Sequence, residues 1–175
     1  MDVYFLGEKL YGDDFNQNQI IDWYKDEEEG YANLGAKHKK DYQYGYHALN
    51  SFYGFSHLPS DKSYQHVLGF GSAYGDELEP LLKHIKKITI LEPSDSLKSS
   101  DFHGIPIKYV KPSPDGSIPF ENNTFDLITC FGVLHHIPNV SKVMTELHRV
   151  LKPNGYLLLR EPTISMGDWR KPRKG

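Results

Sequence analysis

The sequence contains little cysteine and no long hydrophobic stretch. Cys130 is its only cysteine, so the chain cannot close an internal disulfide or build a cysteine zinc site. No run approaches the roughly 18 consecutive apolar residues that predict a membrane-spanning helix. The N-terminus also lacks the basic region and apolar stretch of a secretory signal. We therefore expect a cytoplasmic protein that does not insert into a membrane.

An excess of positive charge is missing as well. The 20 lysines and arginines are balanced by 23 aspartates and glutamates, which gives a net charge of −3. Nucleic-acid-binding domains are usually basic, so DNA or RNA is not the expected partner. We interpret the one basic segment, residues 170–174, as a solvated terminus. The length of 175 residues favours one compact unit with a single core.

Tyrosine is concentrated in the first third of the chain, where eight of the 12 tyrosines precede residue 60. Apolar spacing predicts two helices there, at residues 15–30 and 41–53. The aromatic face of the second helix either packs on the core or lines a substrate pocket, and Tyr46 and His47 are its candidate substrate contacts. We interpret residues 1–60 as an N-terminal helical cap or lid and residues 61–175 as the core.

Short apolar runs separated by turn residues follow this region. They predict strands at residues 65–70, 87–92, 105–110, 124–131 and 156–160. Helical patterns lie between them, at residues 77–85, 95–100 and 139–151. Strands that alternate with helices, and that are apolar on both faces, predict an α/β fold. Its sheet is an open parallel one of about five strands with helices on both faces.

A glycine-rich loop and an acid point to a nucleoside ligand. Ligands bind beyond the carboxyl ends of the strands in such a sheet. Residues 69–76, GFGSAYGD, follow the first predicted strand and let a ligand approach the backbone closely. Glu92 ends the second strand and can accept hydrogen bonds from ribose hydroxyls. A nicotinamide dinucleotide motif starting at Gly69 would need glycine in place of Tyr74, which disfavours a nucleotide-dependent oxidoreductase.

Three further motifs follow in order: IPFENNTFD at 118–126, LHH at 134–136 and LKPNG at 151–155. Together with the glycine loop and Glu92, they make the chain resemble the class I S-adenosylmethionine-dependent methyltransferases, in particular the small-molecule group with a methyltransferase type 11-like domain. The resemblance covers residues 65–162. It implies a Rossmann-like fold, S-adenosyl-L-methionine as cofactor, and methyl transfer to a small-molecule acceptor.

The same resemblance implies which residues form the site. The cofactor-binding set is Gly69, Gly71, Ser72, Gly75, Glu92, Pro93, Asp115, Cys130 and Phe131. In it the glycines pass the methionine end, Glu92 holds the ribose, and Asp115 receives the adenine amino group. His135, in the LHH motif, faces the transfer region and is the candidate catalytic residue. No metal site is expected, because the spacing supplies no third ligand for the histidine pair.

The chain departs from the family pattern at three positions. The family usually has an acid where Gly69 stands and a glycine where Ala73 stands, and the missing acid in particular implies weaker cofactor binding. The adenine acid usually stands at the position of Pro114, one residue before Asp115. A non-catalytic methyltransferase-like binding or scaffold domain is the alternative. The usual strand 6/7 hairpin is also expected to be absent, since only residues 163–175 follow the fifth strand. Either the chain is truncated, or a homodimer covers the open sheet edge.

Overall fold

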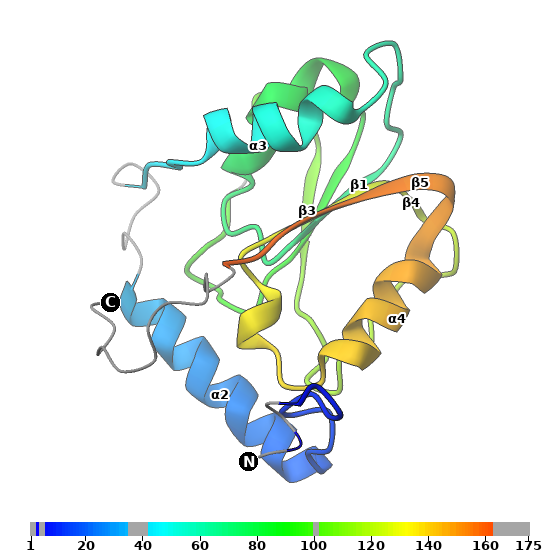
Figure 1. Ribbon diagram of the computed structural model, residues 1–175. Helices are drawn as coiled ribbons and strands as arrows, with labels where there is room; N and C mark the ends of the chain where they lie inside the picture. The colour runs from blue at the N-terminus through cyan, green and yellow to red at the C-terminus, as the bar shows by residue number, and fades with distance from the viewer. Residues whose placement is uncertain (1–2, 4–5, 35–41, 100–101, 163–175) are drawn as a thin grey trace, which may run out of the picture.

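The computed structural model describes residues 3, 6–34, 42–99 and 102–162 of the chain (Figure 1). Its helices are α2 (Gln17–Leu34), α3 (His47–Tyr53) and α4 (Val140–Val150), with short 3₁₀ helices η2 (Phe55–His57), η3 (Asp76–His84) and η4 (Leu134–His136). Its strands are β1 (Val67–Phe70), β2 (Ile88–Leu91), β3 (Ile107–Val110), β4 (Phe125–Phe131) and β5 (Leu151–Arg160). None of the described helices is both long and apolar enough to cross a membrane.

The five strands form one parallel sheet in the order β3-β2-β1-β4-β5. This confirms the predicted fold class. The strand order reverses between β1 and β4, so their carboxyl ends, Phe70 and Cys130, lie side by side. Ligands of open parallel sheets bind at such a reversal point. Within the described residues, β5 is an edge strand, and a bulge between its pairs with Phe125 and Leu127 accommodates residues 152–155.

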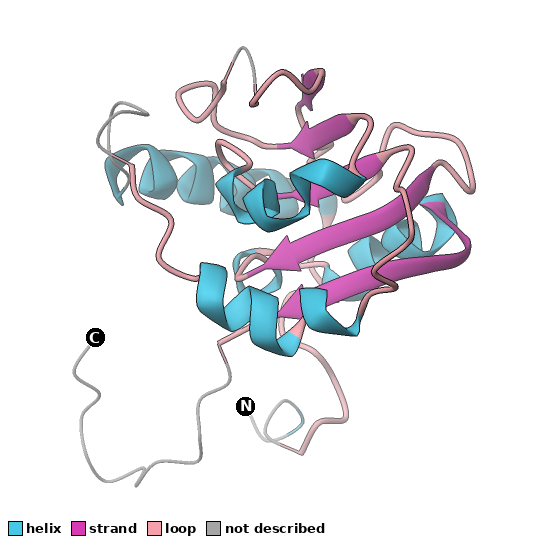
Figure 2. Ribbon diagram, turned by 90° about the horizontal axis from the view of Figure 1, so that it is seen from above, coloured by secondary structure: helices cyan, strands magenta, loops and turns pink. Residues whose placement is uncertain are grey.

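Helices cover both faces of the sheet (Figure 2). Neighbouring residues of β1 point to opposite sides, because side chains alternate along a strand. Val67 contacts the cluster formed with η2 and η3, whereas Leu68 contacts the cluster formed with α4. Strands β1 and β2 are buried at every position. Burial on both sides explains why their sequences are apolar except for Thr89.

The predicted helix over residues 41–53 is wrong in its first half, because α3 begins only at His47. Residues 42–46 have no regular secondary structure instead. Tyr42 packs edge-on against buried Tyr74, with ring centroids 5.1 Å apart. Asn50 Nδ2 donates to the Tyr44 hydroxyl oxygen at 2.6 Å, which folds the segment back on α3. These tertiary contacts outweigh the helical spacing of the tyrosines.

The predicted helix over residues 95–100 is also wrong for its described part, which forms a turn. The Ser94 hydroxyl accepts a hydrogen bond from the Ser96 backbone N–H at 3.3 Å, a local bond that competes with helix formation. Asp95 pairs with Lys98 and with Lys111, the latter at 2.8 Å. These ion pairs of the Asp95 carboxylate stabilise the turn.

Helix α2 lies across the carboxyl ends of the strands, beside η4 (Figure 1). Trp23 Nε1 donates to the carbonyl oxygen of His136 at 2.9 Å. One turn later, Glu27 Oε2 lies 2.8 Å from His136 Nδ1. The predicted first helix is therefore present, and these contacts attach it to the edge of the sheet where ligands bind.

Candidate active site

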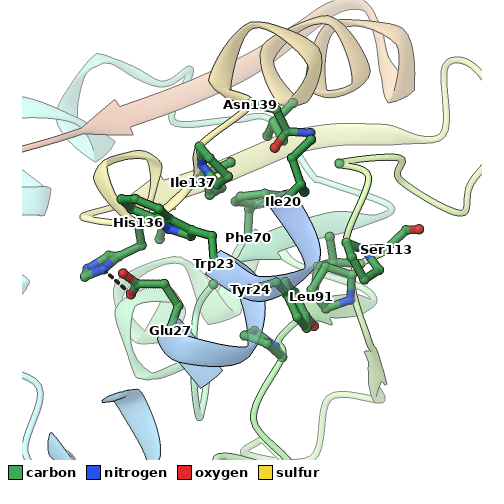
Figure 3. A pocket seen from close by; sticks show the side chains of 18 of the residues that line it. Ile20, Trp23, Tyr24, Glu27, Phe70, Leu91, Ser113, His136, Ile137 and Asn139 are labelled. Atoms are coloured by element: carbon green, nitrogen blue, oxygen red, sulfur yellow. Dashed lines mark hydrogen bonds and ion pairs between the residues drawn. The ribbon is translucent and has the colours of Figure 1, made fainter. Parts of the chain in front are cut away.

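Two adjoining cavities lie at the carboxyl edge of the sheet and share Gly71. The first cavity is enclosed by α2, the end of β2, the loop at 112–118 and the segment 136–139 (Figure 3). The second cavity is enclosed by residues 42–46, the glycine loop at 71–73, Glu77, Leu97, Phe131, Gly132 and Arg160. Together they form one elongated site over the reversal point of the sheet.

Gly71 and Gly75 give the glycine loop its shape. Both adopt left-handed backbone conformations, with φ of 66° and 83°. A Cβ at Gly71 would lie 2.7 Å from two methyl carbons of Val133, and one at Gly75 would lie 2.9 Å from Ile90 Cδ1. Conformation therefore disfavours larger residues at both positions, and at Gly71 the space beside Val133 excludes them as well. The backbone of Gly71 lines both cavities.

Glu92 braces this loop from the end of β2. Its Oε2 accepts a hydrogen bond from the Ala73 backbone N–H at 3.0 Å, and its Oε1 accepts one from the Ser94 backbone N–H at 3.1 Å. Burial raises the pKa of Glu92, although these hydrogen bonds oppose that shift. A carboxylate offers about four acceptor positions. Glu92, which lines the first cavity, therefore retains capacity to accept two more donors.

The walls of the first cavity are largely apolar (Figure 3). Trp23 and Tyr24 face Phe70 and Leu91 across it, as the close-up shows. Such walls suit a flat aromatic group. Pro93, at the end of β2, also lines this cavity.

Asp115 is not among the residues that line the first cavity, and it is exposed. Its carboxylate accepts hydrogen bonds from the Ser117 backbone N–H at 2.9 Å and from the Ser117 hydroxyl at 2.8 Å. These bonds hold the pKa of Asp115 below its ordinary value. Ser113 and Ser117 present polar groups to the cavity from the same loop.

The second cavity brings together two charged residues that the sequence motifs do not indicate. Glu77 is only 4% exposed. Its Oε1 lies 3.4 Å from Thr129 Oγ1, and burial raises the pKa of Glu77 to about 7. The guanidinium of Arg160 lies 4.2 Å from the ring centre of Tyr46 and 5.4 Å from that of Phe131. Ser72 completes the wall beside them.

His135 is held by a carboxylate that follows β5. Its Nδ1 lies 2.7 Å from Glu161 Oε2. The backbone N–H groups of Val133 and Leu134 both donate to Glu161 Oε1 at 2.9 Å. Burial disfavours the charged form of Glu161, but the hydrogen bonds from His135 and the backbone outweigh it and lower its pKa. Glu161 thus fixes both the turn of η4 and the orientation of the His135 ring.

The other candidates have different surroundings. His47 Nε2 lies 3.3 Å from Glu79 Oε2, so this ring turns toward η3, and His47 does not line either cavity. Tyr46 does line the second cavity. Cys130 is fully buried in the core, and burial raises the pKa of its thiol. Gly69, which belongs to β1, is buried beneath the loop.

Sequence reasoning missed Glu77, Arg160 and Glu161. Arg160 ends β5 and Glu161 follows it. Ligands bind beyond the carboxyl ends of parallel strands, so their position in the sequence predicts both residues. Glu77 looks like an ordinary helix-opening acid, because nothing in the sequence shows that its side chain is buried.

Known proteins resemble this chain in sequence. A family described as methyltransferase domain matches residues 68–159, more than half of the chain. A sterol 4-C-methyltransferase of Caenorhabditis elegans is 42% identical over 57 residues, which are 33% of this chain and 17% of the relative. A ubiquinone/menaquinone biosynthesis C-methyltransferase of a Marinomonas species is 32% identical over 92 residues, which are 53% of this chain and 36% of the relative. The chain thus spans little more than a third of these curated relatives at most.

Solved structures share the fold. A phosphoethanolamine N-methyltransferase of Haemonchus contortus, in complex with phosphoethanolamine and S-adenosylhomocysteine, matches 92% of this chain and 38% of its own. The TM-score is 0.64 and the sequence identity 15%. A protein of Leishmania major described as a SAM-dependent methyltransferase matches 77% of this chain and 59% of its own, with a TM-score of 0.61 and 20% identity.

Proposed function

The chain belongs to the S-adenosylmethionine-dependent methyltransferases, and on this premise we propose that it transfers a methyl group from that cofactor to a small organic acceptor. The observation that carries the proposal is the elongated site in which the first and second cavities meet at Gly71, beside the buried acid Glu92. Its apolar part suits an adenine ring, and its charged part suits the methionine end of the cofactor.

The residues of the site fit this cofactor. A Cβ at Gly71 would fill the cradle of the loop, and Glu92 retains acceptor capacity for the two ribose hydroxyls. We assign the adenine to the first cavity, with Ser113 and Ser117 as polar partners and Pro93 in the wall. Ser72 and Phe131 border the methionine end in the second cavity. The earlier assignment of Asp115 to the adenine amino group stays a prediction.

S-adenosylmethionine, when bound, supplies a methyl group that its sulfonium already activates. The chain therefore mainly has to align the acceptor and exclude water, and orientation alone can lower a barrier by about 7 to 11 kcal/mol. We propose that residues 1–60 act as the cap for this purpose and that residues 61–175 form the core. The bonds from Trp23 and Glu27 to His136 support that role, because they hold α2 over the site.

We propose His135 as the general base for acceptors that must lose a proton. Glu161 binds its Nδ1 at 2.7 Å, and no hydrogen bond within the described residues engages Nε2. Because Glu161 binds Nδ1, Nε2 is the atom that would take the proton from the acceptor, and Glu161 is the positioning residue. His135→Gln should lower kcat by about 10²- to 10⁴-fold while the cofactor Kd stays unchanged. An equal loss in kcat and in cofactor affinity would count against this role.

We infer a small acceptor because the second cavity is bordered by Tyr44 and Tyr46, and because the chain lacks a basic surplus for nucleic acid. Two sequence relatives are named as a sterol 4-C-methyltransferase and a ubiquinone/menaquinone biosynthesis C-methyltransferase, and a phosphoethanolamine N-methyltransferase shares the fold. The acceptor atom is therefore best sought with phenols, quinols and primary amines.

Titration calorimetry with S-adenosylmethionine and S-adenosylhomocysteine tests the cofactor, and a panel of these acceptors with detection of S-adenosylhomocysteine tests the activity. We expect binding tighter than about 1 mM and turnover with at least one acceptor class. No binding at that concentration would refute the cofactor assignment. Binding without turnover on any acceptor would favour the scaffold alternative. Binding of a nicotinamide dinucleotide in its place would favour an oxidoreductase.

We further propose that the protein is cytoplasmic, as its single cysteine suggests, and that a second copy covers the open edge of β5. Leu159 on that strand is 47% exposed, and Leu49 and Tyr53 of α3 border a hollow beside it. Light scattering of the wild type and of Leu159→Lys tests this contact. A monomeric wild type would exclude the homodimer.

A further inference from the structure

The place of the acid that the family has at position 69 is already filled in this chain. A Cβ at Gly69 would lie 2.5 Å from Ser72 Oγ, 2.8 Å from Ser72 Cβ and 3.4 Å from Glu77 Oε1. A side chain at position 69 would therefore project toward the carboxylate of Glu77. The negative charge missing from β1 is supplied at nearly the same place from η3.

The local backbone explains how Glu77 reaches this position. Gly75 takes a left-handed conformation directly before η3, and Leu78 and Leu81 anchor η3 in the core. The first turn of η3 is thereby held beneath the glycine loop, where the carboxylate receives hydrogen bonds from Thr129 and Ser72. Both donors belong to the elements that frame the site.

Glu77 has no cation to balance it. Within the described residues, no ion pair joins it to a basic side chain, although it is almost fully buried. Burying an unpaired carboxylate is costly. Since Glu77 lines the second cavity, a cation that enters this cavity can remove that cost.

Arg160 lines the same cavity from the end of β5. Both residues affect the pKa of Tyr44. Burial and the charge of Glu77 raise this pKa. Hydrogen bonds from Asn50 and Arg160, together with the charge of Arg160, lower it. The guanidinium is stacked on aromatic rings, and the edge donors that do not bind Tyr44 are left for an anion. The cavity therefore presents a negative and a positive group to one ligand.

We propose that Glu77 and Arg160 form a zwitterion subsite, in which Glu77 binds the α-ammonium and Arg160 the α-carboxylate of the cofactor's methionine moiety. Glu77 thus takes over, from η3, the place of the acid absent at Gly69. This inference rests on the proposed function, because it needs S-adenosylmethionine as the ligand. It also removes the reason to expect weak cofactor binding from the loop sequence alone.

Ligands that lack one charge at a time test the subsite by calorimetry. S-adenosylmethionine carries the ammonium and the carboxylate, decarboxylated S-adenosylmethionine lacks the carboxylate, and 5′-methylthioadenosine lacks the whole amino-acid end together with the sulfonium charge. Glu77→Gln should weaken the first two ligands by about 10- to 100-fold and leave the third unchanged. Arg160→Gln should weaken S-adenosylmethionine by a similar factor and leave its decarboxylated form unchanged.

Glu121→Gln is the matched control, since it removes one carboxylate charge from an exposed position within residues 61–175. Thermal melting of all variants without ligand shows whether they are folded. Unchanged S-adenosylmethionine affinity in Glu77→Gln, or an equal loss for 5′-methylthioadenosine, would overturn the subsite while the proposed function stands. If the wild type bound none of the three ligands, the proposed function itself would fall, and the subsite with it.

Discussion

Removing the charge of Glu77 should stabilise the protein without ligand. Burial raises the pKa of Glu77 from 4.5 to about 7. Between these values the folded chain binds a proton that the unfolded chain has released, so this group lowers the free energy of unfolding as the pH rises. At one pKa unit per 1.36 kcal/mol, the loss reaches about 3 kcal/mol above pH 7. Glutamine keeps the shape and stays neutral, so the loss disappears.

Urea unfolding of the wild type and Glu77→Gln, at pH values from 5 to 8, measures this difference. We expect a gain of about 1 kcal/mol or less for the variant at pH 5 and a gain of about 3 kcal/mol at pH 8. The other titrating groups are common to both proteins, so their contributions cancel. Glu121→Gln, at an exposed position, serves as the control substitution of the same type. A Glu77→Gln protein that is less stable at pH 8, or a difference independent of pH, would refute the reasoning.

Three other substitutions have definite expected outcomes. Gly71→Ala should cost about 2 to 4 kcal/mol in urea unfolding, because position 71 has φ of 66° and no room for a methyl group. Glu146→Gln should cost about 1 to 3 kcal/mol at pH 7. Hydrogen bonds from Arg149 lower the pKa of Glu146 to about 2, so the wild-type advantage, full above pH 4.5, should fade as the pH falls toward 2. Glu161→Gln should lower kcat with little change in cofactor Kd, because His135 loses its orienting anion; a kcat equal to that of the wild type would contradict that role.

The sheet was predictable because its signal is local. The runs at residues 67–70 and 88–91 are apolar except for Thr89, and turn residues bound them. Residues 42–46 were not predictable in the same way. Tyr42 and Tyr46 have helical spacing with Leu49 and Tyr53, but Tyr42 packs on Tyr74 and Tyr44 binds Asn50, which are contacts with other elements.

The candidate site shows the same division. The glycine loop and Glu92 could be found because their function depends on position along the chain, at the ends of β1 and β2. Glu77 could not, because its importance comes from burial and from the empty position at Gly69, and neither is visible in a sequence. A departure from a motif is therefore weak evidence for lost binding until the surroundings of that position are known.

Cofactor binding should release a proton below neutral pH. At pH 6.5, Glu77 with a pKa of about 7 is roughly three-quarters protonated, and binding an ammonium requires its charged form. The other ionisable groups around the second cavity are Asp76, Tyr42, Tyr44, Tyr46, Glu92 and Arg160. The pKa values of Tyr42 and Tyr44 are raised, so neither of these two titrates in this range.

Calorimetry in two buffers of different ionisation enthalpy counts the released protons. We expect roughly 0.7 protons at pH 6.5 and almost none at pH 8.5 for the wild type. Burial also raises the pKa of Glu92, so a smaller release can come from that acid. Glu77→Gln isolates the two contributions, since only the part due to Glu77 disappears in it. Equal binding heats in both buffers at pH 6.5 would mean that Glu77 does not become charged when the cofactor binds.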